Sequence, residues 1–147
     1  MPRFFDSSDD APAYLSPRRA LEYLRRGAVL LDIRESHETD YRAFDVPSAI
    51  LLPYSVFRER QGDVPREVPL VVADAVGLRG KEIASFLLEN GYPEVAWMVG
   101  GVVDWVREGL PTKTDRNYEL RGQCGCKLRP ANAKEMPNRV PGPKSRP

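Results

Sequence analysis

Short apolar runs alternate with helix-like segments through residue 111. The runs are nearly continuous, which is typical of strands that are buried on both faces of a sheet. They cover residues 28–33, 49–52, 69–73 and 95–98. The segments between them predict helices at 17–26, 35–44, 53–60, 80–90 and 101–107. This alternation indicates an α/β domain in which helices cover a parallel sheet.

Two of the predicted helices carry clear end signals. Ser16 is a favourable N-cap, Pro17 suits the first helical position, and Gly27 ends the apolar stripe of that helix. The helix at 80–90 has apolar residues on one face and Gly91 at the position after its C-cap, where a left-handed residue commonly ends a helix.

Charge and composition divide the chain into three parts. With 147 residues, 41% of them hydrophobic, it can bury the core of about one domain. Residues 1–111 hold 13 Lys/Arg and 18 Asp/Glu, whereas residues 112–147 hold 9 and 3. We therefore expect an N-terminal segment at 1–13, a domain at 14–111 and a basic, Pro-rich tail at 112–147. No stretch resembles a membrane span or a secretory leader, so we expect a cytoplasmic protein that does not enter membranes.

The segment 71–80, Val-Val-Ala-Asp-Ala-Val-Gly-Leu-Arg-Gly, has the layout of a catalytic loop. A buried strand enters a short loop, and the loop opens a helix. Successive backbone N–H groups and a helix N-terminus then point at one spot, which can receive an anion or a developing negative charge. A nucleophilic Cys would suit the first loop position, but Asp74 stands there.

Residues 14–111 resemble a rhodanese-like domain, the fold of single-domain sulfurtransferases. The resemblance rests on an ordered set of motifs: Asp-Ile-Arg at 32–34, Val-Pro-Ser-Ala-Ile at 46–50, Asn-Gly-Tyr at 90–92, and the closing Gly-Gly, Trp and Gly-Leu-Pro of 100–111. It implies a three-layer α/β fold with a parallel sheet of about five strands, flanked by helices, followed here by an extended C-terminal tail.

The active loop departs from the family pattern, which is similar to Cys-Arg-Ser-Gly-Val-Arg. Alignment to that pattern puts Asp74 in place of the Cys that accepts sulfur, Ala75 in place of the first Arg and Val76 in place of the Ser. The last three positions of the pattern are matched by Gly77, Leu78 and Arg79, so the loop keeps its length. The resemblance thus identifies 74–79 as a vestigial active-site loop, with no catalytic residue in it.

Two roles are open for Asp74. A carboxylate forms no adduct comparable to a persulfide, so Asp74 cannot simply replace the thiolate. The favoured interpretation is that it accepts hydrogen bonds from the N–H groups of the loop and closes the old site. The other is an aspartyl-phosphate nucleophile, which would need a metal, and no second carboxylate adjoins it in sequence.

Other charged residues receive mainly structural interpretations. Arg79 either attracts an anion to the loop or, as we favour, pairs with Asp74 or Asp32. Arg34 and Glu35 are expected to form a structural bracket at the strand end, although in the family this region, with Asp32, lines the mouth of the active site. His37 is expected to be solvated or capping rather than a catalytic base.

The remaining chemistry lies in the tail, where Cys124 and Cys126 are flanked by Arg121 and Lys127. Neighbouring positive charge favours thiolates, so these residues are alternative thiols for sulfur transfer, persulfide carriage or a reversible disulfide. They could also be small exposed residues of a turn. A zinc site would need about two further ligands, and we expect neither a metal nor a cofactor.

The sequence therefore favours a rhodanese-like protein without its loop nucleophile, acting as a binding or regulatory module in sulfur metabolism. The alternative is a sulfurtransferase or persulfide carrier that uses the tail cysteines. The basic tail suits an acidic protein partner or a sulfur donor or acceptor. No aromatic interleaving or recognised motif favours nucleic acid. The oligomeric state is left open.

Overall fold

The computed structural model describes residues 4–5 and 11–114. Within that range the chain divides into two compact units. The first holds the described residues up to Glu35 and those from Phe44 to Thr112. The second holds Ser36–Ala43 together with Lys113 and Thr114.

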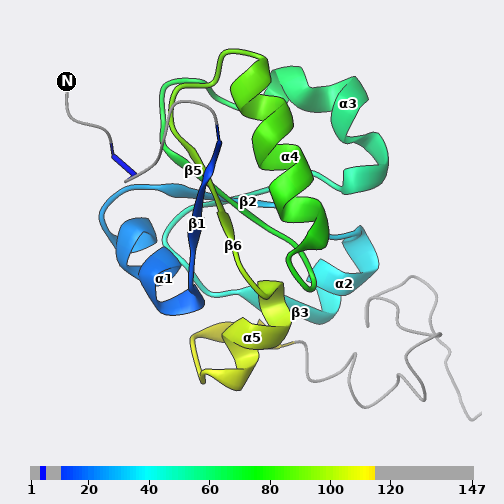
Figure 1. The fold of residues 1–147 in the computed structure, drawn as a ribbon. Helices are drawn as coiled ribbons and strands as arrows, with labels where there is room; N and C mark the ends of the chain where they lie inside the picture. Colours follow the sequence, from blue (N-terminus) through cyan, green and yellow to red (C-terminus); the bar gives the residue numbers. More distant parts are fainter. Residues whose placement is uncertain (1–3, 6–10, 115–147) are drawn as a thin grey trace, which may run out of the picture. The chain divides into compact units, whose positions relative to one another are not determined.

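A five-stranded parallel sheet forms the centre of the first unit (Figure 1). The strand order is β1-β6-β5-β2-β4, and every neighbouring pair runs parallel. The strands are β1 (Ala13–Leu15), β2 (Val29–Asp32), β4 (Ala49–Leu51), β5 (Leu70–Ala73) and β6 (Val95–Met98). Because β5 lies in the middle, the loop that follows it opens at the centre of the carboxyl edge of the sheet.

Helices cover both faces of this sheet (Figure 1). The helices α1 (Pro17–Arg25) and α5 (Gly101–Arg107) pack on one face. On the other lie α4 (Leu78–Glu89) and α3 (Phe57–Arg60), the latter between the short 3₁₀ turns η1 (Tyr54–Val56) and η2 (Gln61–Asp63). The predicted three-layer α/β architecture is therefore confirmed.

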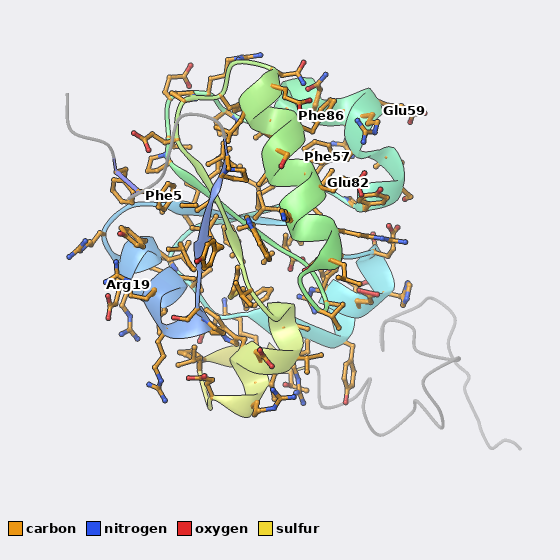
Figure 2. The ribbon with its side chains drawn as sticks, viewed as in Figure 1. Phe5, Arg19, Phe57, Glu59, Glu82 and Phe86 are labelled. Carbon is orange, nitrogen blue, oxygen red and sulfur yellow. The ribbon has the colours of Figure 1, made fainter. Side chains whose placement is uncertain are left out.

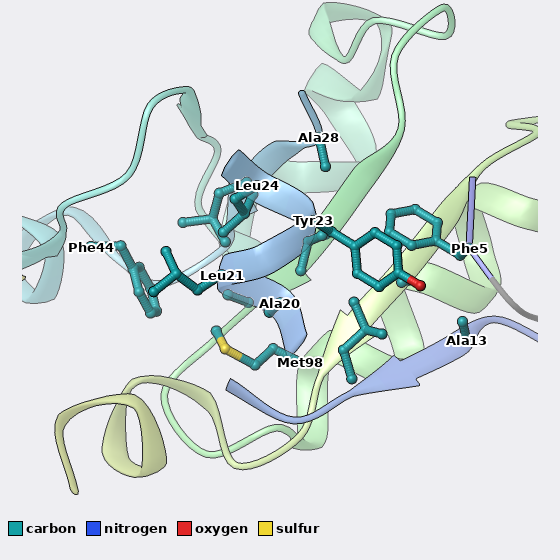
Figure 3. Packing of buried hydrophobic residues seen from close by; sticks show 14 of the residues in the cluster. Phe5, Ala13, Ala20, Leu21, Tyr23, Leu24, Ala28, Phe44 and Met98 are labelled. Atoms are coloured by element: carbon teal, nitrogen blue, oxygen red, sulfur yellow. The ribbon is translucent and has the colours of Figure 1, made fainter. Parts of the chain in front are cut away.

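Alternating residues of the central strands supply two separate cores. In β5, Val71 and Ala73 join the core under α1 and α5, whereas Leu70 and Val72 join the core under α3 and α4. Figure 3 shows the first core, where Leu21 and Leu24 of α1 meet residues of the sheet and Phe44. In the second core Phe57 and Phe86 approach edge to face, with ring centroids 6.1 Å apart (Figure 2). Burial of both faces explains why the strands carry nearly continuous apolar runs.

The end signals of the first and fourth helices are confirmed. The Ser16 side chain accepts a hydrogen bond from the backbone N–H of Arg19, and Pro17 is the first residue of α1. At the end of α4, Gly91 has a φ of +88°. The N–H groups of Gly91 and Tyr92 donate to Leu88 and Leu87, respectively, as in a Schellman motif.

The second unit contains α2 (Ser36–Tyr41), and a two-stranded sheet pairs β3 (Arg42–Phe44) with β7 (Thr112–Thr114). The prediction of one helix over 35–44 is therefore wrong at its end, because residues 42–44 form a strand. Within the described range, no helix has both the length and the apolar character needed to cross a bilayer.

Candidate functional site

The candidate site is the turn between β5 and α4, at the carboxyl edge of the sheet. Residue Asp74 follows the last residue of β5 directly, and α4 begins four residues later at Leu78. Gly77 makes this short connection possible, since it lies at the N-cap with a φ of +100°, a conformation that L residues with a side chain rarely adopt. The loop therefore turns the chain sharply enough to aim its N–H groups inward.

The Asp74 carboxylate fills the space that these N–H groups surround. Its Oδ1 accepts from the backbone N–H of Gly77 at 2.5 Å, and its Oδ2 accepts from Arg79 at 2.8 Å and from Gly80 at 3.3 Å. The residue is only 5% exposed. The predicted hydrogen bonds of Asp74 are thus confirmed, and the two N–H groups from the first turn of α4 add the favourable end of the helix dipole.

A second backbone segment holds the loop from outside. The N–H groups of Val102 and Val103, in the first turn of α5, donate to the carbonyl oxygens of Asp74 and Ala75 at 2.9 and 3.2 Å. This approach requires glycine at 101, where an added Cβ would lie 2.4 Å from Asp74 O and from the Ala75 carbonyl carbon. The closing Gly-Gly pair of the sequence therefore lets the backbone of α5 pack closely against the loop at 74–77.

Next to the loop, Asp32 and Arg34 form a buried ion pair at the end of β2. The guanidinium donates to both carboxylate oxygens, from Nε to Oδ1 at 3.0 Å and from Nη2 to Oδ2 at 2.8 Å. The backbone N–H of Arg34 also donates to Oδ1. Both side chains are at most 3% exposed, and the guanidinium lies 5.0 Å from the ring centroid of Phe44. The predicted bracket at the strand end is confirmed for Arg34.

The favoured pairing of Arg79 is wrong. Among the described residues its guanidinium forms no ion pair with Asp74 or Asp32, because backbone donors satisfy the first carboxylate and Arg34 satisfies the second. Instead Arg79 lies over the ring of Tyr54, 4.4 Å from its centroid. Only its backbone N–H reaches Asp74.

A polar cluster that the sequence did not reveal adjoins Arg79. The Tyr54 hydroxyl donates to Glu82 at 2.6 Å, and Arg58 pairs with the same carboxylate at 3.1 Å. The hydrogen bond to Glu82 raises the pKa of Tyr54 above its ordinary value. These residues meet because η1 and α3 pack against α4. They are far apart in the sequence, so no local motif predicts the cluster.

The other predicted residues are distributed around the loop or lie elsewhere. Val76 and Leu78 point outward, 53% and 80% exposed. His37 is exposed on α2, as expected. Cys124 and Cys126 lie outside the described residues. In the described ranges no three His, Cys, Asp or Glu side chains converge as a metal site would require.

The geometry defines a class of protein: a parallel α/β domain with a short anion-receiving loop at the carboxyl end of its central strand. Residues 16–108 match the family model described as the rhodanese-like domain. The chain belongs to the rhodanese-like domain family. It is 32% identical over 104 residues to thiosulfate sulfurtransferase GlpE of Haemophilus influenzae, across 68% of this chain and 93% of that protein. A sulfurtransferase of Allochromatium vinosum is 30% identical over 83 residues, across 56% of this chain and 76% of that protein.

Solved structures agree on the fold. The rhodanese-related protein of Thermoplasma volcanium has a TM-score of 0.62 at 24% identity, covering 70% of this chain and 99% of that one. The polysulfide-sulfur transferase homodimer of Wolinella succinogenes has a TM-score of 0.65 at 22% identity, covering 76% and 85%. At these identities the likeness describes the architecture and not the activity.

Proposed function

We propose that this rhodanese-like domain carries no sulfur on its loop and acts as a binding or regulatory module in sulfur metabolism. The observation that carries the proposal is the occupation of the loop by Asp74. Three backbone N–H groups that could stabilise an anionic group already bond to its carboxylate. An anionic sulfur donor would have to displace a fixed negative charge from this cradle.

The chemistry of the side chain supports the same conclusion. Sulfur transfer through a persulfide needs a thiolate that attacks the donor and later releases the sulfur, and a carboxylate offers no such soft nucleophile. The chain has two cysteines, both in the tail. The proposal therefore leaves the tail as the only place where the chain itself could carry sulfur as a persulfide.

A second candidate function uses that tail. Cys124 and Cys126 lie among basic residues, which favour the thiolate form. A tail thiol would then carry the sulfur. The domain would bind an acidic protein partner, or the molecule that donates or accepts the sulfur.

The test compares the full chain with the Cys124→Ser/Cys126→Ser variant. Each is incubated with thiosulfate and with a low-molecular-weight persulfide, and mass spectrometry records the gain of one sulfur atom while turnover is measured. We expect neither adduct nor turnover in the variant. Sulfur transfer that persists without both cysteines would overturn the proposal, and an adduct confined to the wild type would establish the tail as carrier.

Asp74→Cys in the same cysteine-free background provides a positive control for the loop. Backbone hydrogen bonds from α5 also hold the loop, whatever side chain follows β5, so we expect the N–H groups to stay in place and this variant to gain a sulfur adduct. An unmodified Asp74→Cys protein would show that the loop does not support sulfur transfer even with a thiol in place.

A further inference from the structure

A groove runs along the outer edge of the sheet at β1, apart from the loop residues described above. It has a volume of about 580 Å³ and is lined by β1, the residues that precede it, α1, α4 and β6. Its side chains include Tyr14, Tyr23, Trp97, Arg19 and Lys81. The groove therefore combines aromatic side chains, two cations and an open strand edge, a set that suits an extended anionic ligand.

Among the described residues, no strand pairs with the outer edge of β1. β1 lies at the end of the strand order, with only β6 beside it in the sheet (Figure 1). Val99 N–H donates to Leu15 O at 2.8 Å, so the backbone groups of Leu15 face β6. Because these groups alternate in direction along a parallel strand, the N–H and C=O of Tyr14 face the open edge. An added extended segment could accept and donate at this position.

The two faces of the groove are similar in chemistry. Tyr14 pairs with Trp97 on the α4 side, where their ring centroids are 6.3 Å apart, and Lys81 of α4 lines the same side. Tyr14 is 72% exposed. On the α1 side, Arg19 (Figure 2) donates to the Tyr23 hydroxyl at 3.1 Å and lies 5.3 Å from that ring centroid. Each face thus presents one aromatic surface and one cation.

The two cations are available to a ligand. In the described part of the chain, the Lys81 ammonium has no ion-pair partner. Arg19 pairs with Glu22 at 3.6 Å, but both side chains are more than half exposed, and a pair of this kind contributes little. A bound carboxylate can therefore engage both groups without breaking a buried interaction.

We propose that this groove binds an extended acidic segment of another protein, which adds to the edge of β1 as a further strand. Side chains of such a strand alternate between the two faces of the sheet. Acidic side chains would therefore meet Lys81 on one face and Arg19 on the other, and apolar neighbours would cover Tyr14 and Trp97. Edge-to-edge pairing of two copies is less favourable, since it would gather four cations at one junction.

The probe is a fluorescein-labelled peptide of about six residues, the usual length of one strand, in which pairs of Glu alternate with pairs of Val, so that each face of the added strand carries both residue types. The matched control is the same peptide with Lys in place of each Glu. Binding to the full chain is followed by fluorescence anisotropy at low and at moderate ionic strength. We expect the acidic peptide alone to bind, and its affinity to fall as salt screens the exposed charges.

Arg19→Glu/Lys81→Glu reverses both charges of the groove. We expect it to weaken binding of the acidic peptide about tenfold, as for the loss of two exposed charge pairs, and to give preference to the basic peptide. Both changes put an acid near a helix N-terminus, which is compatible with folding. Arg25→Glu is the control, because Arg25 is exposed on α1 and does not line the groove.

Tyr14→Pro removes the N–H that faces the edge, and proline is tolerated at the edge of a sheet. We expect this variant to bind the acidic peptide several-fold more weakly. Urea denaturation checks that it still folds. Equal binding of both peptides, or unchanged binding after charge reversal, would overturn the proposal.

Two further results would assign the groove to a different occupant, and both would contradict the proposal. A dimer in sedimentation velocity that Tyr14→Pro dissociates would assign the edge to a second copy. Binding of the acidic peptide only after Asp6, Asp9 and Asp10 are replaced by Asn would assign it to the acidic N-terminal segment of the chain itself.

Discussion

The contribution of Asp74 to stability can be worked out from its three hydrogen bonds. Asp74→Ala leaves the N–H groups of Gly77, Arg79 and Gly80 without their acceptor. A hydrogen bond to a charged group contributes about 1.5–3 kcal/mol, and the longest of the three contributes least. Water that enters the vacated space restores part of the loss. We therefore expect Asp74→Ala to lower the free energy of unfolding by about 2–4 kcal/mol.

Urea denaturation measures this loss as a lower midpoint at an unchanged slope. Asp74→Asn keeps one accepting oxygen but turns an NH₂ group toward the remaining donors, so its loss should be about 1–2 kcal/mol. Glu59→Ala on α3 is the control, since Glu59 is exposed and should change stability by no more than about 0.5 kcal/mol. If Asp74→Ala matched this control, the carboxylate would not hold the loop closed, and the reasoning would be refuted.

Three other predictions concern the surroundings of the loop. Arg34→Met leaves the buried Asp32 carboxylate without its cation and should cost about 3–5 kcal/mol in urea denaturation, so a loss below about 1 kcal/mol would contradict the pairing. Trp105→Ala empties a fully buried site and should also cost about 3–5 kcal/mol, and a wild-type midpoint would exclude a core role. Tyr54 should ionise above its ordinary pKa of 10.0 in an ultraviolet pH titration, and Glu82→Gln should lower that pKa. Because the folded-state pKa is raised, this contact stabilises the fold below pH 10.0 and loses its contribution as the pH rises through the raised value.

Much of the fold could be predicted because its strands are buried on both faces. The run 69–73 has no polar residue and the run 28–33 has only Asp32, and only a sheet covered by helices buries such runs fully. β1 was missed for the opposite reason. It has three residues, Ala-Tyr-Leu, and one of them is largely exposed at the edge, so its strand character comes from pairing with β6 rather than from its own pattern.

The site was predictable only where chain-local geometry determines it. A carboxylate between a strand and a helix N-terminus lies within reach of the next N–H groups, so the bonds of Asp74 followed from position alone. The partners of Asp32 and Arg79 depend on which long side chains the fold brings within hydrogen-bond or stacking distance. Arg34 emerges two residues beyond Asp32 and takes both of its oxygens, which leaves Arg79 to stack on Tyr54 from a different element.

The bonds between the start of α5 and the carbonyl groups of Asp74 and Ala75 have a consequence for how such a site can change. They join main chain to main chain, so they do not depend on which side chain follows β5. The glycine at 101 secures the same contact by its lack of a Cβ. The backbone of the loop therefore keeps its N–H groups in place independently of the side chain at position 74. A change of one codon can replace a reactive side chain there by an unreactive one without altering the loop.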